Sequence, residues 1–175
     1  MDRIAEELVA YRFPRWNELP SFDIYMDQVL YILNNVLGPL YFHPEEAVVT
    51  ASMVNNYVKN SLLKPPVKKH YDHTHIAFLI VVCVLKRCFS LREISVLIDI
   101  HAHMEGSSLE MAYNRFADYF ELYLHEIFKD GNVDAIHLPD DILYEQQLLA
   151  NVVQSVVTKM YAQYCIEIAI QNAQK

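Results

Sequence analysis

Five of the eight histidines fall in two short stretches that also contain aspartate. The first stretch holds His70, Asp72, His73 and His75, and the second holds Asp99, His101 and His103. Imidazole and carboxylate groups bind zinc or nickel. Consecutive ligands on one helical turn point in different directions, however, and no cysteine pair or His-Glu-x-x-His pattern completes either group. We therefore expect no metal site and no other cofactor.

Sequence signatures of catalysis are absent. The chain contains no glycine-rich phosphate loop, no nucleophile elbow and no carboxylate pair at catalytic spacing, so we do not expect an enzyme. The three cysteines, Cys83, Cys88 and Cys165, form no CxxC pair and are expected to be buried, reduced thiols. The longest apolar run, 76–85, is shorter than the roughly 20 residues that cross a bilayer, and the N-terminus lacks the features of a secretory signal. These features predict a cytoplasmic protein with no membrane partner.

Positive charge is concentrated in one part of an acidic chain. The net charge is −8, but residues 50–92 carry seven basic groups against Asp72 alone. This segment is therefore +6 and the remainder −14. The basic residues are Lys59, Lys64, Lys68, Lys69, Lys86, Arg87 and Arg92. Such a segment indicates a localised face that binds anions.

The elements around this segment are predicted to be helical, because only three glycines occur and strong helix formers recur in long segments. Residues 1–22 begin with a short amphipathic piece and continue as an extended arm. A helix from Asp23 should end at Gly38-Pro39, and Thr50 should cap a short helix with its polar side outward. Tandem prolines in 62–71 forbid helix and predict an exposed, basic connection.

Capping signals divide the rest of the chain. Asp72 should cap a helix that is apolar on all sides over 76–85 and therefore forms the core. Ser90 and Glu93 have the spacing of a capping box, and Ser107 and Glu110 repeat it. The second of these boxes begins a helix that should end at residues 130–132.

The last helix, of about 30 residues after Pro139, has apolar pairs every four positions from 148/149 to 168/169. This repeat exceeds the helical period of 3.6, so the stripe precesses around the helix and one partner cannot cover it. We expect a homodimer. The predicted organisation is an arm over 1–22, a helix-turn-helix domain over 23–104 and a helical dimerisation region over 105–175.

Residues 53–98 resemble the N-terminal module of MerR-type transcription regulators. Its order is a recognition helix (53–61), Leu-Leu-x-Pro (62–65), a basic wing (68–70), a tyrosine (71), a central helix (76–87) and Phe-Ser-Leu-x-Glu-Ile (89–94). The stretch 54–60, with Lys86 and Phe89, is similar to a bacterial family numbered 1836 among the domains of unknown function, over about residues 20–150. The chain departs from MerR proteins in having Ser61 where they have glycine, a shorter wing, and a longer segment between 38 and 50.

The resemblance implies an all-α fold with a winged, or degenerate winged, helix-turn-helix that binds double-stranded DNA. Asparagine can pair with an adenine edge, and each lysine can neutralise a phosphate. The predicted DNA-binding residues are Asn55, Asn56, Lys59, Asn60, Lys64, Lys68, Lys69 and His70.

Two functions remain open at this point. The first is a homodimeric DNA-binding transcription regulator that senses an unidentified small-molecule effector. The second is a protein-interaction module that keeps the helix-turn-helix scaffold without DNA binding. Aromatic residues of the C-terminal half, such as Tyr113 and Phe116, either line an effector pocket or form core.

Overall fold

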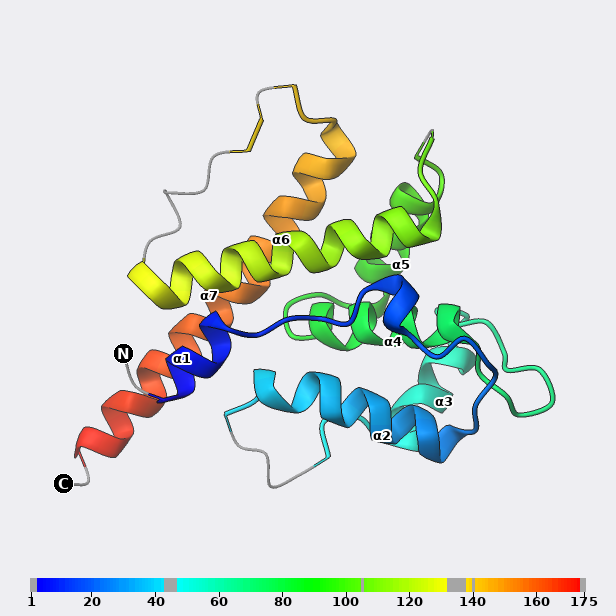
Figure 1. Cartoon of the computed structure of the whole chain (residues 1–175), viewed down its shortest axis with the longest axis horizontal. Coiled ribbons are helices and arrows are strands. Elements are labelled where there is room, and N and C mark those ends of the chain that lie inside the picture. The colour runs from blue at the N-terminus through cyan, green and yellow to red at the C-terminus, as the bar shows by residue number, and fades with distance from the viewer. Residues whose placement is uncertain (1–2, 43–46, 105, 132–137, 140, 174–175) are drawn as a thin grey trace.

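Helices account for almost all regular structure in the computed structural model, which describes residues 3–42, 47–104, 106–131, 138–139 and 141–173 (Figure 1). The elements are α1 (Arg3–Val9), η1 (Trp16–Glu18), α2 (Met26–Leu37), η2 (Gly38–Leu40), α3 (Ala51–Lys59), α4 (His73–Leu85), α5 (Leu91–Ala102), α6 (Leu109–Asp130) and α7 (Tyr144–Ala173). The only β-pairing among these described residues is two isolated bridges. The predicted all-α class is therefore confirmed.

The central element is α4, as its apolar sequence predicts. Nine of its thirteen residues are buried, and Ile76, Leu79 and Ile80 have no exposed surface. In Figure 1, α2 lies on one side of α4, and α6 lies on the other with α7 behind it. Burial of each such aliphatic side chain contributes about 1.5–3 kcal/mol, so this helix holds the surrounding elements together.

The helix caps mostly follow the sequence signals. Thr50, Asp72 and Ser90 each accept a hydrogen bond from the backbone N–H three residues ahead. The second capping box is wrong by one residue: the cap of α6 is Ser108, whose Oγ accepts from the N–H of Met111 at 3.1 Å. A glutamate therefore does not stand at the reciprocal position of this cap.

The N-terminal segment packs along α6. Phe13 is fully buried against Phe116 and Phe120. Arg15 forms a two-pronged ion pair with Glu121, with N···O distances of 2.6 and 2.7 Å. The arm is consequently part of the core.

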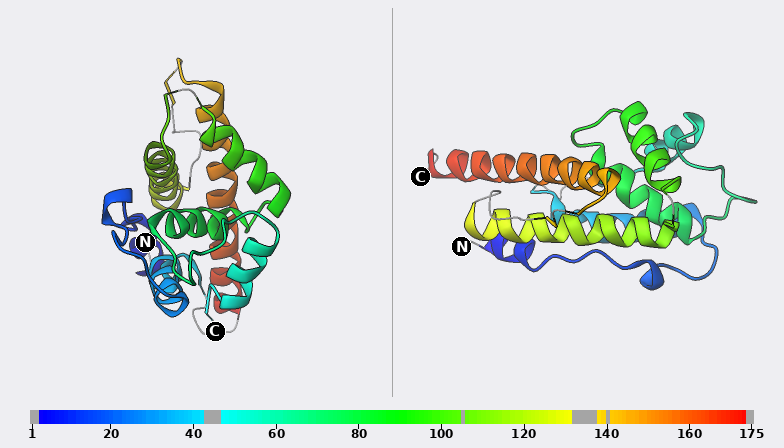
Figure 2. Two further views of the ribbon diagram at one scale, coloured as in Figure 1. Left: turned by 90° about the vertical axis from the view of Figure 1, so that its right-hand side faces the viewer. Right: turned by 90° about the horizontal axis from the view of Figure 1, so that it is seen from above.

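The last helix is covered over only part of its length. Its buried residues lie between Leu149 and Met160, whereas Ile166 and Ile170 are 58% and 46% exposed. Figure 2 shows the C-terminal end of α7 reaching past the other helices. None of the described helices has both the length and the apolar character needed to cross a membrane.

The cysteines differ from the expectation. Cys83 is buried, and burial raises the pKa of its thiol to about 12. Cys88 and Cys165 are exposed, so the prediction of three buried thiols is wrong for these two. All three are free thiols.

Candidate nucleic-acid interface

The helix α3 presents one polar face to solvent. Its inner side is fixed by Val54 and Tyr57, which are buried in the core. Asn55, Asn56 and Lys59 are exposed on the other side. A short amphipathic helix held only by its apolar stripe can display that polar face to a partner.

The end of α3 explains the unusual Ser61. Its backbone is left-handed, with φ of 58°. The N–H of Leu62 donates to the carbonyl of Tyr57 at 3.0 Å, and the N–H of Ser61 donates to that of Val58 at 3.0 Å. These two bonds define a Schellman motif, whose left-handed position favours glycine. Ser61 therefore occupies a strained position that reverses the chain into the basic connection.

The basic connection contains a minimal hairpin. Val67 and His70 exchange two backbone hydrogen bonds, of 3.2 and 2.9 Å, around a two-residue turn. Lys68 and Lys69 occupy the turn with φ of 51° and 68°. Positive φ at both central positions defines a type I′ turn, which strongly prefers Asn-Gly. Each left-handed lysine costs about 1–2 kcal/mol of backbone strain, and both lysines are exposed at the tip.

The hairpin is tied to the segment that precedes α2. Ile24 and Tyr71 exchange backbone hydrogen bonds of 2.9 and 2.8 Å, and both side chains are buried. The ring of His70 lies on that of Tyr25, with centroids 4.3 Å apart. Residues 24 and 25 thus form a support that we did not predict, because a single bridge leaves no periodic signal in the sequence. Figures 1 and 2 show the connection between α3 and α4 projecting from the body.

The asparagines in α3 and at its C-cap are not equivalent. The side-chain amide of Asn60 donates to the backbone oxygen of Asn56 at 2.8 Å and to its Oδ1 at 3.0 Å. The side chain of Asn60 is therefore used in hydrogen bonds at the C-terminal end of α3. Asn55 is exposed and makes no side-chain hydrogen bond with another described residue.

Lysines at the hairpin end are exposed and unneutralised. Lys59, Lys64, Lys68 and Lys69 form no ion pair with any carboxylate in the described parts of the chain. No acidic residue occurs between positions 59 and 71. Asp72 is the nearest carboxylate in sequence, and it is occupied as the cap of α4 through a 3.0 Å bond from the N–H of His75. This stretch therefore carries four lysines without a carboxylate of its own, and Asp72 and Asp99 line the same groove as Lys64.

The remaining basic residues of 50–92 lie elsewhere. Lys86 and Arg87 follow the far end of α4, which is about 20 Å long, and Arg92 lies in the first turn of α5. The Arg87 guanidinium donates to the carbonyl of Leu40 at 2.8 Å and lies 3.9 Å from the centre of the Tyr41 ring. The seven basic residues thus form two groups rather than one face.

The loop before α3 is fastened by Asn34 of α2. Its Nδ2 donates to the carbonyl of Val49 at 3.0 Å, and its Oδ1 accepts from the N–H of Val49 at 3.0 Å. This pair of bonds sets α3 relative to α2 across a connection that is longer than a tight turn. Asn34 was not among the predicted residues, because an asparagine within a helical pattern is usually read as surface.

The histidine stretches do not converge. The ring of His75 contacts the Asp72 carboxylate at 2.7 Å, whereas His73 packs edge-on against Trp16. In the second stretch His103 bonds the carbonyl of Asp99 at 2.8 Å. Within the described residues no three groups of the His, Cys, Asp and Glu types are placed to hold a metal ion.

The structure thus describes an all-helical protein with a small exposed polar helix beside a lysine-tipped hairpin. Residues 14–116 match the model of the family described as Domain of unknown function (DUF1836), and the chain belongs to this family. The match spans η1 through the first third of α6 and includes α3 and the hairpin in full. Comparisons with curated proteins and with solved structures found no match.

Proposed function

We propose that this protein is a DNA-binding transcription regulator of MerR-like type. In this proposal α3 enters the major groove as the recognition helix, and the hairpin of residues 67–70 contacts the phosphate backbone as a minimal wing. The observation that carries the proposal is the two-lysine type I′ turn. Its strain opposes folding and gains no packing, so a functional role for the exposed charges is the simplest reason to retain it.

The roles of the site residues follow from their surroundings. Lys64, Lys68 and Lys69 neutralise phosphates and release counterions, while Lys59 does so at the end of α3. Asn55 and Asn56 read base edges in the major groove. Asn60 and His70, which are held by Asn56 and Tyr25, act by fixing the shape of the helix end and of the hairpin.

The regulator would act as a homodimer. Ile166 and Ile170 on the projecting end of α7 remain exposed, and a second copy of this helix is the partner we expect to cover them. A two-fold axis there would present two hairpins to one duplex, as paired half-sites require.

The test is binding to a random-sequence duplex across a salt series, followed by fluorescence anisotropy. We expect affinity to fall steeply with salt for the wild type, and Lys68→Glu with Lys69→Glu to weaken binding at least tenfold and to reduce the salt slope by about 2. The matched control is Lys86→Glu with Arg92→Glu, which makes the same change in net charge at the other basic group. Equal losses in the two double variants would contradict the proposal.

A protein-interaction module is the second candidate function. It is favoured by the net charge of −8 and by the exposed isoleucines of α7. Absence of any DNA binding at low salt, by a protein shown to be folded, would support this alternative.

A further inference from the structure

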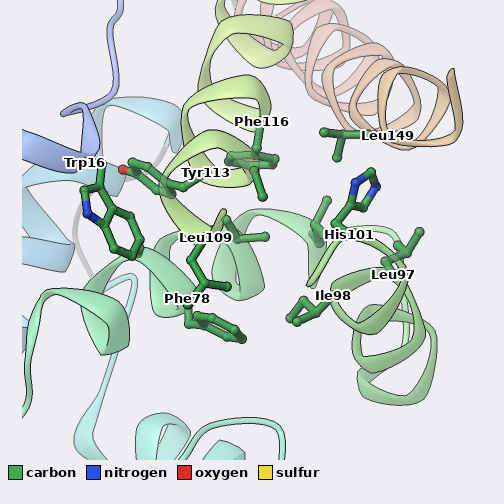
Figure 3. Close-up of a pocket in the computed structure, with 13 residues that line it drawn as sticks. Trp16, Phe78, Leu97, Ile98, His101, Leu109, Tyr113, Phe116 and Leu149 are labelled. Carbon is green, nitrogen blue, oxygen red and sulfur yellow. The ribbon is translucent and has the colours of Figure 1, made fainter. Parts of the chain in front are cut away.

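A small apolar cavity of about 80 Å³ lies where η1, α4, α5, α6 and α7 meet. Four aromatic side chains line it, namely Trp16, Phe78, Tyr113 and Phe116 (Figure 3). The hydroxyl of Tyr113 is already used, because it donates to the carbonyl of Pro14 at 2.8 Å. The aromatic wall is therefore apolar toward the cavity.

His101 supplies the polar group of this cavity. It extends from α5 toward Phe116 of α6 and Leu149 of α7 (Figure 3). The residue is only 8% exposed, and neither of its ring nitrogens has a hydrogen-bond partner in the described structure. A buried polar atom without a partner carries its full desolvation cost, which a hydrogen bond to a ligand in the cavity would offset.

The charges around His101 favour its neutral form. Burial lowers its pKa, Arg115 of α6 lowers it further, and Glu145 of α7 opposes them. On its own helix, Asp99 and His103 are exposed. A neutral imidazole offers one hydrogen-bond acceptor and one donor, which is the complement of a hydroxyl group.

We propose that this cavity binds a simple phenol, a single aromatic ring with one hydroxyl group, whose hydroxyl pairs with His101. The ring would pack edge-to-face or offset against Trp16, Phe78 and Phe116. An apolar cavity of about 150 Å³ is known to admit benzene. The present cavity is about half that size, so the ring enters only if a lining side chain moves outward; Leu109, which is 41% exposed, is the lining residue in the best position to do so. The proposal does not depend on DNA binding.

The cavity adjoins a groove that runs beside the first residues of the basic connection. Phe78, Ile98 and Leu109 line both the cavity and a wider neighbouring groove. That groove is also lined by Leu62 and Leu63, which follow α3. A bound phenol would thus contact side chains that also line the groove beside the basic connection.

The test uses Trp16, the sole tryptophan, as the reporter. The full-length protein is titrated with phenol and with toluene, which lacks the hydroxyl, while tryptophan emission is excited at its red edge. We expect saturable changes with both ligands and about tenfold tighter binding of phenol, the factor that one hydrogen bond supplies. His101→Leu should abolish this preference, whereas His103→Leu should retain it.

A second pair of variants tests the cavity itself. Ala112→Leu fills the cavity from α6 and should abolish binding of both ligands, whereas Ala162→Leu, at an exposed position of α7, should not change it. Far-UV circular dichroism checks that each variant is folded. Both ligands are titrated up to the concentration at which toluene reaches its solubility limit. The proposal is overturned if phenol produces no saturable change in tryptophan emission over this range. It is also overturned if folded His101→Leu keeps the preference for phenol, or if folded Ala112→Leu binds phenol like the wild type.

Discussion

The two ends of α4 carry similar numbers of basic residues but use them in opposite ways. At the C-terminal end, Arg87 donates to the carbonyl of Leu40, and Lys86 and Lys159 donate to the carbonyls of Phe89 and Arg87. At the N-terminal end, Lys68 and Lys69 face solvent on a strained turn. The difference makes the N-terminal end of α4 the better candidate for an interface, because Lys68 and Lys69 have no internal partner there among the described residues.

The largest effect on stability should come from the C-terminal end of α4. Arg87→Ala removes a hydrogen bond from a charged group and the contact with the Tyr41 ring. We expect it to lower the free energy of unfolding by about 2–3 kcal/mol, measured by urea denaturation. Lys64→Ala, at the hairpin end, should change stability by less than about 0.5 kcal/mol. A loss for Lys64→Ala as large as that for Arg87→Ala would remove the distinction between the two ends.

A substitution at the hairpin tip is expected to raise the free energy of unfolding. Lys68→Asn with Lys69→Gly places the preferred type I′ pair in the turn and should raise the free energy of unfolding by about 1–2 kcal/mol. The same change should weaken DNA binding about tenfold, because two phosphate contacts are lost. Urea denaturation and anisotropy on one preparation measure both quantities. If the variant gains stability and binds DNA as tightly as the wild type, the strained lysines have no role in binding.

A smaller loss of stability is expected from substitution of Asp72, which lies between the hairpin and α4. Asp72→Ala should cost about 1 kcal/mol at neutral pH, since the cap of α4 is lost. Burial raises the pKa of this carboxyl, but the hydrogen bonds from His75 and the nearby imidazoles lower it on balance below its usual value of 3.8. A lowered pKa means that the charged form stabilises the fold. This contribution is present above about pH 4 and is lost as the pH falls below it.

The matched variant for this position is Asp72→Asn, which keeps a capping oxygen but does not titrate. It should retain most of the stability at neutral pH and lose the acid dependence below about pH 4. Thermal unfolding across this range measures the difference. An acid dependence identical in Asp72→Asn and the wild type would show that other carboxylates are responsible.

The smallest change in stability, a gain, is expected from substitution of Ser61. Ser61→Gly relieves the left-handed backbone at the Schellman position and should stabilise the protein by about 0.5–1 kcal/mol. DNA affinity should stay unchanged, because no cation is removed. Destabilisation by this substitution would indicate that the serine side chain has a partner beyond its backbone role.

The sequence predicted the helices well because their signals are local. The all-apolar run of α4, the caps at Thr50, Asp72 and Ser90, and the stop at Gly131 are each set by neighbouring residues. The cap of α6 was misplaced by one residue because adjacent serines, Ser107 and Ser108, offer the same chemistry. Local patterns therefore placed the caps to within one residue, whereas α2 begins at Met26 rather than at Asp23 and α7 begins at Tyr144, several residues after Pro139.

The candidate site was only partly predictable, because its geometry depends on long-range contacts. The exposure of Asn55 and of the hairpin lysines follows from amphipathic spacing and from the prolines. The bridge from Ile24 to Tyr71, the clamp of Asn34 on Val49 and the inward turn of Arg87 join residues distant in sequence. The positive φ of Lys68 and Lys69 was also unpredictable, since lysine rarely adopts it.

The most direct test of the central claim is to map DNA contacts by backbone amide chemical shifts in an NMR titration with a short random duplex at low salt. The account predicts shifts concentrated in residues 55–60 and 64–70, with little change at residues 86–92, and loss of the shifts as salt is raised. Shifts concentrated at residues 86–92, or no shifts at any salt concentration, would contradict it.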